Sequence, residues 1–361
     1  MKYAISEIEI SKIKLNRRRL VELCSSIGLE VMGVTKVTAA LPAVARAMLE
    51  AGVAKLADSR LANLKKLRES GLGAPVYLLR LPAASQAEEV VELATGSLNS
   101  EIDTIKALSR AATKLEKTHR VMLMVDLGDL REGIWADDVV RTAREIAGLP
   151  GIELEGLGTN LTCFGGVCPT PDNLGRLASL AREVENATGL KLTTVSGGNS
   201  SSLKLVQEGR IPEGVTQLRL GESIMLGRET IAREPIPGAH LDAFVITAEV
   251  IEVKDKPSFP VGEIGQDAFG NVPAFVDRGI RRRAICALGR QDAVLDGLEH
   301  DPVPGQVVLG MRRPAAELGQ QHRPVVAGER RGAERDALAR QVRSQLVDPG
   351  ELGLDVGPQL L

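Results

Sequence analysis

One lysine stands in an apolar segment where a charged amine is costly. Residues 31–37 read VMGVTKV, and Lys36 is the only charged side chain among them. A buried ammonium must be paired or must lose its charge. Most lysines near a strand end simply extend into solvent. A lysine that is desolvated near other cations instead has a lowered pKa and becomes an amine nucleophile. Lys36 is therefore a candidate for covalent chemistry with a carbonyl compound.

A glycine- and serine-rich segment, SGGNSSS at residues 196–202, predicts an anion site. Gly197 and Gly198 let the backbone approach a ligand closely. Ser200 then stands at the start of a helix-like segment, where free N–H groups and the helix dipole favour an anion. Gly221 leaves a second stretch of backbone unobstructed. Taken alone, the same letters also fit a flexible turn with a capping residue.

These residues need elements that bring them together, and the chain provides a regular alternation. Short β-rich runs alternate with helix-like segments between residues 29 and 222, which is the order of an α/β protein. Eight strands match a TIM (β/α)8 barrel, and a doubly wound open sheet is the alternative because spacing cannot prove closure. The expected strands are 29–37, 54–59, 75–80, 95–100, 120–128, 152–160, 190–197 and 215–222. The expected helices are 11–28, 41–51, 61–70, 85–93, 101–117, 136–147, 172–187 and 200–209.

Polar residues follow these strands, and the C-terminal strand ends of a barrel form its active-site face. Lys36 ends the first strand, and Arg219 and Gly221 lie at the end of the eighth. A phosphate site commonly follows strands 7 and 8. A lysine, a phosphate cradle and a barrel together suggest pyridoxal 5′-phosphate (PLP), an aldehyde held by Lys36 as a Schiff base. A barrel enzyme that binds a phosphorylated metabolite without PLP is an alternative.

Composition narrows the class of protein. The 361 residues carry a formal net charge of −2, so no basic field points to nucleic acid. No apolar run reaches membrane-spanning length, and the N-terminus has no signal-peptide core, so we expect a cytoplasmic protein. The four cysteines and four histidines are scattered, and we expect reduced cysteines and no zinc site.

We expect three regions. Residues 1–235 form the PLP-binding barrel. Residues 236–310 form a smaller β-rich C-terminal domain, because the alternation stops and 243–254 and 282–292 look like strands. Residues 311–361 are rich in Arg, Gln, Ala and Gly and contain no aromatic residue, although sheets favour aromatic and β-branched side chains. We expect this tail to be poorly folded or translated from a shifted reading frame.

Seven motifs resemble those of the alanine racemase-like, fold-type III PLP enzymes, and ornithine and lysine racemases form the most similar branch. The resemblance covers residue 1 to about residue 310. The motifs, in chain order, are GVTKV, LADSRLANLKKL, SLNSEI, MVDLGDLREG, GTNLTCFGG, SGGNSSS and QLRLGESIMLGRE.

The resemblance implies a role for each matching residue on the phosphate side. Lys36 is the Schiff-base lysine and one catalytic base. Ser200, with Asn199 beside it, matches the phosphate-binding serine. Gly221 and the backbone of Glu222 match the amides that hold the phosphate.

The resemblance also implies that two arginines contact the ring. Arg131 matches the arginine near the phenolic oxygen, and Arg219 matches the one that hydrogen-bonds the pyridine nitrogen. A guanidinium donates but does not readily protonate, so the ring is a weaker electron sink than a pyridinium. A short-lived carbanion favours racemisation over transamination. A plain salt bridge at the strand end is the alternative for Arg219.

Racemisation needs an acid or base on each face of Cα. In alanine racemases the second group is a tyrosine from the partner subunit, but this chain has only Tyr3 and Tyr77. Cys163 and Asp267 are the candidates, and a buried structural cysteine or a loop carboxylate is the alternative for each.

The resemblance implies a homodimer with composite active sites and a basic amino-acid substrate such as ornithine. The distal ammonium of that substrate needs an anion, which Asp129, Glu132, Glu222 or Asp267 can provide, although each can also be a solvated surface charge. A non-catalytic PLP-binding homeostasis protein is the alternative function. The second domain argues against it, whereas the missing tyrosine and the unusual tail favour it.

Overall fold

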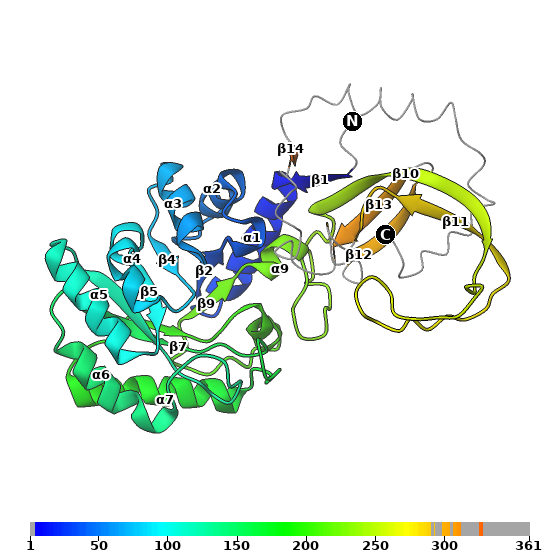
Figure 1. Ribbon diagram of the computed structural model, residues 1–361. Helices are drawn as coiled ribbons and strands as arrows, with labels where there is room; N and C mark the ends of the chain where they lie inside the picture. Colours follow the sequence, from blue (N-terminus) through cyan, green and yellow to red (C-terminus); the bar gives the residue numbers. More distant parts are fainter. Residues whose placement is uncertain (1–3, 290–291, 293–297, 304–305, 312–324, 328–361) are drawn as a thin grey trace. The chain divides into compact units, whose positions relative to one another are not determined.

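Eight parallel strands close into a barrel in the computed structural model (Figure 1). The structure describes residues 4–289, 292, 298–303, 306–311 and 325–327. The barrel strands are β2 (Glu30–Val34), β3 (Lys55–Asp58), β4 (Val76–Leu78), β5 (Gly96–Asn99), β6 (His119–Met124), β7 (Ile152–Gly158), β8 (Thr194–Ser196) and β9 (Gln217–Leu220). Pairing of β9 with β2 completes the circle, with Met32 opposite Arg219. The TIM barrel is confirmed, and the open sheet is excluded.

Helices surround the barrel and connect its strands. Their bounds are α1 (Ile10–Ser25), α2 (Pro42–Glu50), α3 (Leu61–Glu69), α4 (Ala87–Leu93), α5 (Ile102–Lys114), α6 (Val139–Ala147), α7 (Pro171–Thr188), α8 (Leu203–Gln207) and α9 (Glu222–Leu226). Short 3-10 turns are η1 (Lys36–Thr38), η2 (Ala84–Gln86), η3 (Ala136–Asp138) and η4 (Ser200–Ser202). The local signals that set α7 are clear: Thr170 caps it, Pro171 opens it and Gly189 ends it at φ +70°.

The main apolar core lies between the sheet and these helices. Val121 and Leu123 of β6 pack with Ile146 of α6 and with Leu177 and Val184 of α7. The barrel interior holds a second apolar layer that includes Met32 and Tyr77. Because both faces of a parallel strand are buried, its sequence reads as a continuous apolar run rather than an alternating one.

Charged groups close the N-terminal end of the barrel interior. The Lys55 ammonium lies 3.1 Å from the Glu155 carboxylate and 3.3 Å from that of Glu30. Gln217 also donates to Glu30 over 2.9 Å. The contact with Lys55 pairs the buried Glu155 carboxylate, which would otherwise be costly.

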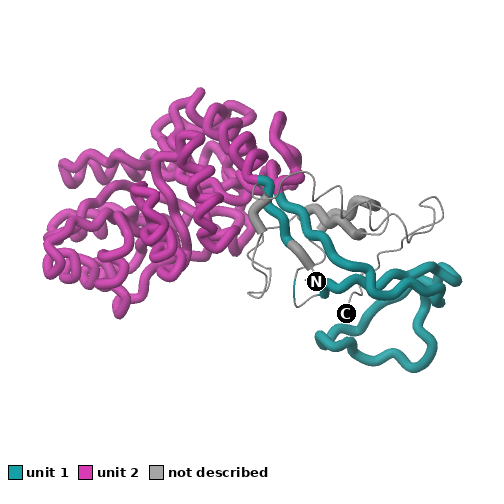
Figure 2. The backbone as a smooth tube through the Cα atoms, turned by 90° about the horizontal axis from the view of Figure 1, so that it is seen from above, with its two compact units in different colours: residues 1–9, 244–361 teal, residues 10–243 magenta. Residues whose placement is uncertain are grey.

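A second unit comprises residues 1–9 and 244–361 (Figure 2). Its strands are β1 (Ala4–Glu9), β10 (Phe244–Pro257), β11 (Ile280–Cys286), β12 (Leu298–Val303), β13 (Gln306–Met311) and β14 (Val325–Ala327). The small antiparallel sheet agrees with the expected β-rich domain. The sequence did not predict β1, because this short strand pairs with β10, about 240 residues away, and gives no local signal of its own.

The barrel unit extends from Ile10 to Ala243, so the segment 236–243 groups with it. Of the tail 311–361, the structure describes Met311 and the three residues of β14, which pair with β1 in parallel. The rest of the tail lies outside the described residues, and our expectation for it stays a prediction. Among the described residues, no helix is both long enough and apolar enough to span a membrane.

Candidate active site

Lys36 opens the turn η1 and is separated from the end of β2 by Thr35 alone. The preceding residue is fixed, because the Thr35 hydroxyl donates to the buried Asp58 carboxylate over 2.8 Å. Asp58 in turn accepts from Asn63 at 2.9 Å and from two backbone N–H groups at the start of α3. Ala39, which follows the turn, has a φ of +48°. Such left-handed residues are uncommon outside glycine and cluster at functional sites. The backbone that carries Lys36 is therefore held in one place.

The Lys36 side chain itself is exposed. Its ammonium makes no hydrogen bond or ion pair with another described residue. The chain alone therefore does not provide the expected desolvated amine, because the Lys36 side chain is exposed. Any desolvation must come from what binds there.

Two buried hydroxyls form a cradle after β8 and β9. Ser200 accepts a hydrogen bond from the Ser223 N–H over 3.3 Å, which joins the two loops. The hydroxyls of Ser201 and Ser223 are buried and have no partner among the described residues. A buried hydroxyl without a partner is costly, so this cradle fits an acceptor-rich group such as a phosphate.

Asn199 and Gly221 shape the cradle by contacts within the chain. The Asn199 side-chain oxygen accepts from the Ser201 N–H over 2.9 Å, so this side chain caps η4. A Cβ at Gly221 would lie 2.8 Å from the Val34 carbonyl oxygen. Close packing against β2 therefore requires this glycine, in addition to any approach of a ligand.

Arg219 is a deeply buried cation of the site, at 3% exposure. Its guanidinium donates to the Ser196 hydroxyl at 2.5 Å, and to the Thr159 carbonyl and the Asn160 side-chain oxygen at 2.6 Å each. Burial lowers its pKa to about 10, against the opposing effect of nearby Glu132 and Cys163. The group stays protonated at neutral pH and acts as a fixed donor.

The loop after β7 is tied to the loop after β6 by Asp129. This buried carboxylate accepts from the N–H groups of Cys163 at 3.0 Å, Phe164 at 2.9 Å and Val167 at 3.0 Å. Burial alone would raise its pKa, but these backbone donors outweigh burial and hold the pKa below its usual value. Asp129 was a candidate partner for a substrate ammonium. That expectation is wrong, because its oxygens face the loop backbone.

Cys163 is exposed, so the alternative of a buried structural cysteine is wrong. Its sulfur accepts from the Asn199 amide over 3.3 Å and lies close enough to Arg219 to affect its titration. The thiol therefore belongs to the same end of the barrel as the cradle.

The remaining charged candidates are paired. Arg131, a partly exposed residue, contacts Glu132 over 2.8 Å, and Asn160 also donates to Glu132. Glu222 accepts from Arg233. Glu132 and Glu222 therefore each have a partner already, and the distal ammonium of a substrate would have to displace it.

Asp267 lies in the second unit, in the loop between β10 and β11. Its carboxylate accepts from the N–H groups of Phe269 and Asn271 at 2.9 Å each. Within the second unit, the Asp267 carboxylate therefore organises its own loop.

Sequence reasoning gave no role to Asn160, Ser201 and Ser223. Asn160 was visible at the end of a predicted strand, and the two serines stand beside predicted phosphate ligands. The positions of these three residues along the chain were therefore informative. Their hydrogen-bond partners, which define their roles, depend on the folded geometry and cannot be read from the sequence.

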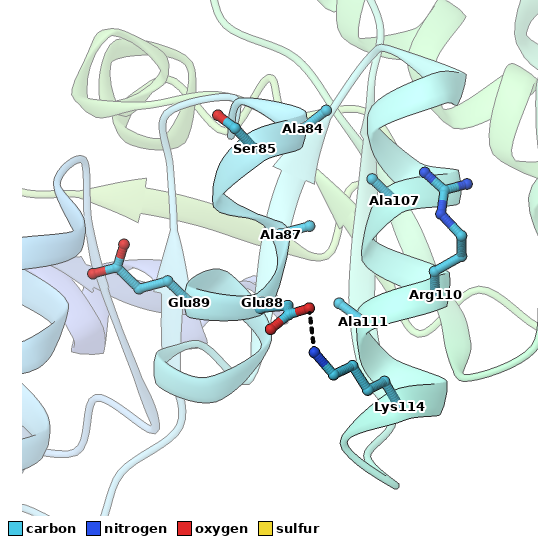
Figure 3. Close-up of a pocket in the computed structure, with 9 residues that line it drawn as sticks. All are labelled: Ala84, Ser85, Ala87, Glu88, Glu89, Ala107, Arg110, Ala111 and Lys114. Carbon is cyan, nitrogen blue, oxygen red and sulfur yellow. Dashed lines mark hydrogen bonds and ion pairs between the residues drawn. The ribbon is translucent and has the colours of Figure 1, made fainter.

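A surface groove between α4 and α5 is unrelated to these residues (Figure 3). Its lining includes alanines from both helices, and a 2.8 Å ion pair joins Lys114 of α5 to Glu88 of α4. Among the described residues, no cluster of His, Cys, Asp or Glu could hold a metal ion.

Comparisons with known proteins agree with this geometry. The ornithine racemase of Acetoanaerobium sticklandii is 47% identical over 292 residues, which cover 81% of this chain and 82% of that protein. The lysine racemase of Thermotoga maritima is 41% identical over 291 residues, 81% of each protein.

Solved structures establish the fold independently. The alanine racemase from a D-cycloserine-producing Streptomyces lavendulae superposes with a TM-score of 0.64 at 16% identity, and covers 91% of this chain and 98% of that chain. The sequence profile described as "Alanine racemase, N-terminal domain" matches residues 8–229, which is more than half of the chain. This chain belongs to the alanine racemase N-terminal domain family.

Proposed function

We propose that this amino-acid racemase uses PLP held on Lys36 and acts on ornithine or another basic amino acid. The observation that carries the proposal is the meeting of three features at one end of one barrel. Lys36 follows β2, the unpaired hydroxyls of Ser201 and Ser223 follow β8 and β9, and the buried Arg219 lies in β9. The basic substrate is supported by the names of the two relatives that match 81% of the chain.

PLP, when bound, supplies an electron sink that stabilises negative charge at Cα of an attached amino acid. Arg219 would donate to the ring nitrogen, and its hydrogen bonds to Ser196, Thr159 and Asn160 hold that donor in place. Because a guanidinium keeps its own proton, it limits how far charge moves into the ring. That limit favours prompt reprotonation of Cα.

Two groups of this chain would move the proton at Cα. Lys36 serves one face. For the other face, Cys163 is supported by its exposure and its place beside Asn199 and Arg219. Asp267 is the second candidate, and it would act from the second unit of a partner subunit. Tyr77 is excluded because it is buried inside the barrel.

A homodimer is part of the proposal. Large apolar side chains are exposed on the barrel loops at Leu130, Trp135 and Phe164. The β10–β11 loop of the second unit exposes others, including Phe269. Apolar surface of this kind is typical of protein–protein contacts.

The direct test follows the optical rotation of L-ornithine with the purified, PLP-loaded protein. We expect rotation to fall to zero, and we expect Lys36→Ala to abolish the change. Borohydride reduction followed by digestion should add the mass of a pyridoxyl group to the peptide that contains Lys36. A protein that binds PLP but leaves every tested L-amino acid unchanged would instead support the homeostasis alternative. A protein that takes up no PLP at all would contradict both.

A further inference from the structure

A continuous chain of side-chain contacts joins the two arginines of the site. Arg219 donates to the side-chain oxygen of Asn160 over 2.6 Å. The Asn160 amide nitrogen donates to one oxygen of Glu132. Arg131 contacts the other oxygen of Glu132 over 2.8 Å. The loops that follow β6 and β7 are thus connected to strand β9 through one amide and one carboxylate.

The donors and acceptors in this chain permit only one arrangement. A guanidinium only donates, so the oxygen of Asn160 must face Arg219. An ionised carboxylate only accepts, so the nitrogen of Asn160 must face Glu132. The amide cannot turn over without losing both contacts, so it adds a third fixed acceptor for the Arg219 guanidinium to those of Ser196 and Thr159.

We propose that Asn160 and Glu132 are positioning residues that hold Arg219 and Arg131 in fixed relation to each other. The inference rests on the proposed function, in which Arg219 contacts the nitrogen of the PLP ring, and on the role near the phenolic oxygen that the family resemblance implies for Arg131. One carboxylate would then set the spacing of both ring contacts through the protein, without itself touching the cofactor.

The charges around Arg219 agree with this role. Its pKa is lowered to about 10 by burial, and Arg131 opposes its charge further. Glu132 and Cys163 act in the opposite direction and favour the protonated form. The Glu132 side chain is only 13% exposed, so solvent screens its charge weakly. Without Glu132, two arginines would face each other with less compensation.

A double-mutant cycle on PLP affinity tests the coupling. We expect Asn160→Leu to weaken PLP binding about tenfold, the scale of one lost charge-assisted hydrogen bond. Glu132→Gln, which keeps the shape of the side chain, should weaken binding in the same direction. The double variant should be no weaker than the weaker single variant, because either change interrupts the same path. Glu183→Gln, which breaks a surface pair with Arg176 on α7, should bind PLP as the unchanged protein does.

The pH profile of kcat/KM for L-ornithine gives a second readout. In Glu132→Gln the alkaline limb should move to lower pH, because Arg219 loses a group that favours its protonated form. A purely structural defect would lower the whole profile without moving that limb. If Asn160→Leu does not fold, Glu132→Gln alone decides through PLP affinity and this limb.

Two results would overturn the positioning role of Asn160 and Glu132 and leave the proposed function intact. One is strictly additive effects in the double-mutant cycle. The other is a Glu132→Gln protein whose PLP affinity and whose alkaline limb of the pH profile are both unchanged. Failure of the unchanged protein to bind PLP would instead overturn the proposed function.

Discussion

His119 is a single residue whose burial should make the stability of the protein depend on pH. It is 1% exposed, and its ring nitrogen lies 2.8 Å from the Ser97 hydroxyl in the layer outside β5 and β6. Burial opposes the charged form and lowers its pKa to about 4. An unfolded chain protonates histidine near 6.5, so the unfolded state takes up this proton first as the pH falls.

We therefore expect the buried His119 to lower the free energy of unfolding at acid pH. The loss begins as the pH drops below about 6.5, and it reaches about 2 kcal/mol by pH 4.5. Urea unfolding at pH 7 and at pH 4.5 measures it, with His119→Gln as the control that keeps a hydrogen-bonding side chain. Parallel losses in the two proteins would show that His119 does not stay neutral when folded.

For single residues, the sequence predicted positions in the fold but not hydrogen-bond partners. The strand ends placed Lys36 and Arg219 at the same face, since parallel strands of a barrel end together. No pattern indicated that Asp129 binds the backbone of Cys163 and Phe164, more than thirty residues away. Asp129 was read as an available anion because a charge and its position are visible in a sequence, whereas its hydrogen-bond partners are not.

At the scale of elements, the eight barrel strands were predictable because each is a short apolar run between helical segments. Their lengths were less so: the predicted strand 190–197 forms only Thr194–Ser196. Contacts with neighbouring strands decide where pairing stops, and β8 shares a single paired position with β9. The strand β1 was missed for the same reason, because its partner is remote in sequence.

Replacing a glycine by alanine should change the free energy of unfolding in opposite directions in β7 and in α7. A Cβ at Gly156 in β7 would lie 1.7 Å from the Thr194 carbonyl oxygen of β8, so Gly156→Ala must separate the two strands. We expect a loss of about 3 kcal/mol in the free energy of unfolding. Gly175, inside α7, has no atom within 4 Å of its Cβ position, and Gly175→Ala should gain about 1 kcal/mol. Urea denaturation compares them, and equal tolerance at both positions would contradict the tight β7–β8 approach.

At the scale of the whole molecule, mixing variants can tell which candidate acts as the second base. If Asp267 acts across a homodimer, Lys36→Ala and Asp267→Ala are each inactive, but a mixed dimer has one complete site. A statistical mixture should then recover about a quarter of the original activity.

Cys163 and Lys36 belong to the same barrel, so the mixture of Cys163→Ala with Lys36→Ala should recover nothing. Racemisation of L-ornithine after refolding each pair together is the measurement. Recovery in neither mixture, with Cys163→Ala inactive alone, assigns the second face to Cys163. Full activity of both Cys163→Ala and Asp267→Ala would exclude both candidates.

The pairing of β1 with β10 has a consequence for biosynthesis. Ala4–Glu9 leaves the ribosome before the barrel, but the strand that it joins, Phe244–Pro257, is translated only after the entire barrel. Since domains generally fold as units while the chain is still growing, the leading segment must wait without its partner until the barrel has emerged. A bulky insertion beside Ala4–Glu9, or a deletion of this segment, should therefore harm the sheet that contains β10 before it harms the barrel.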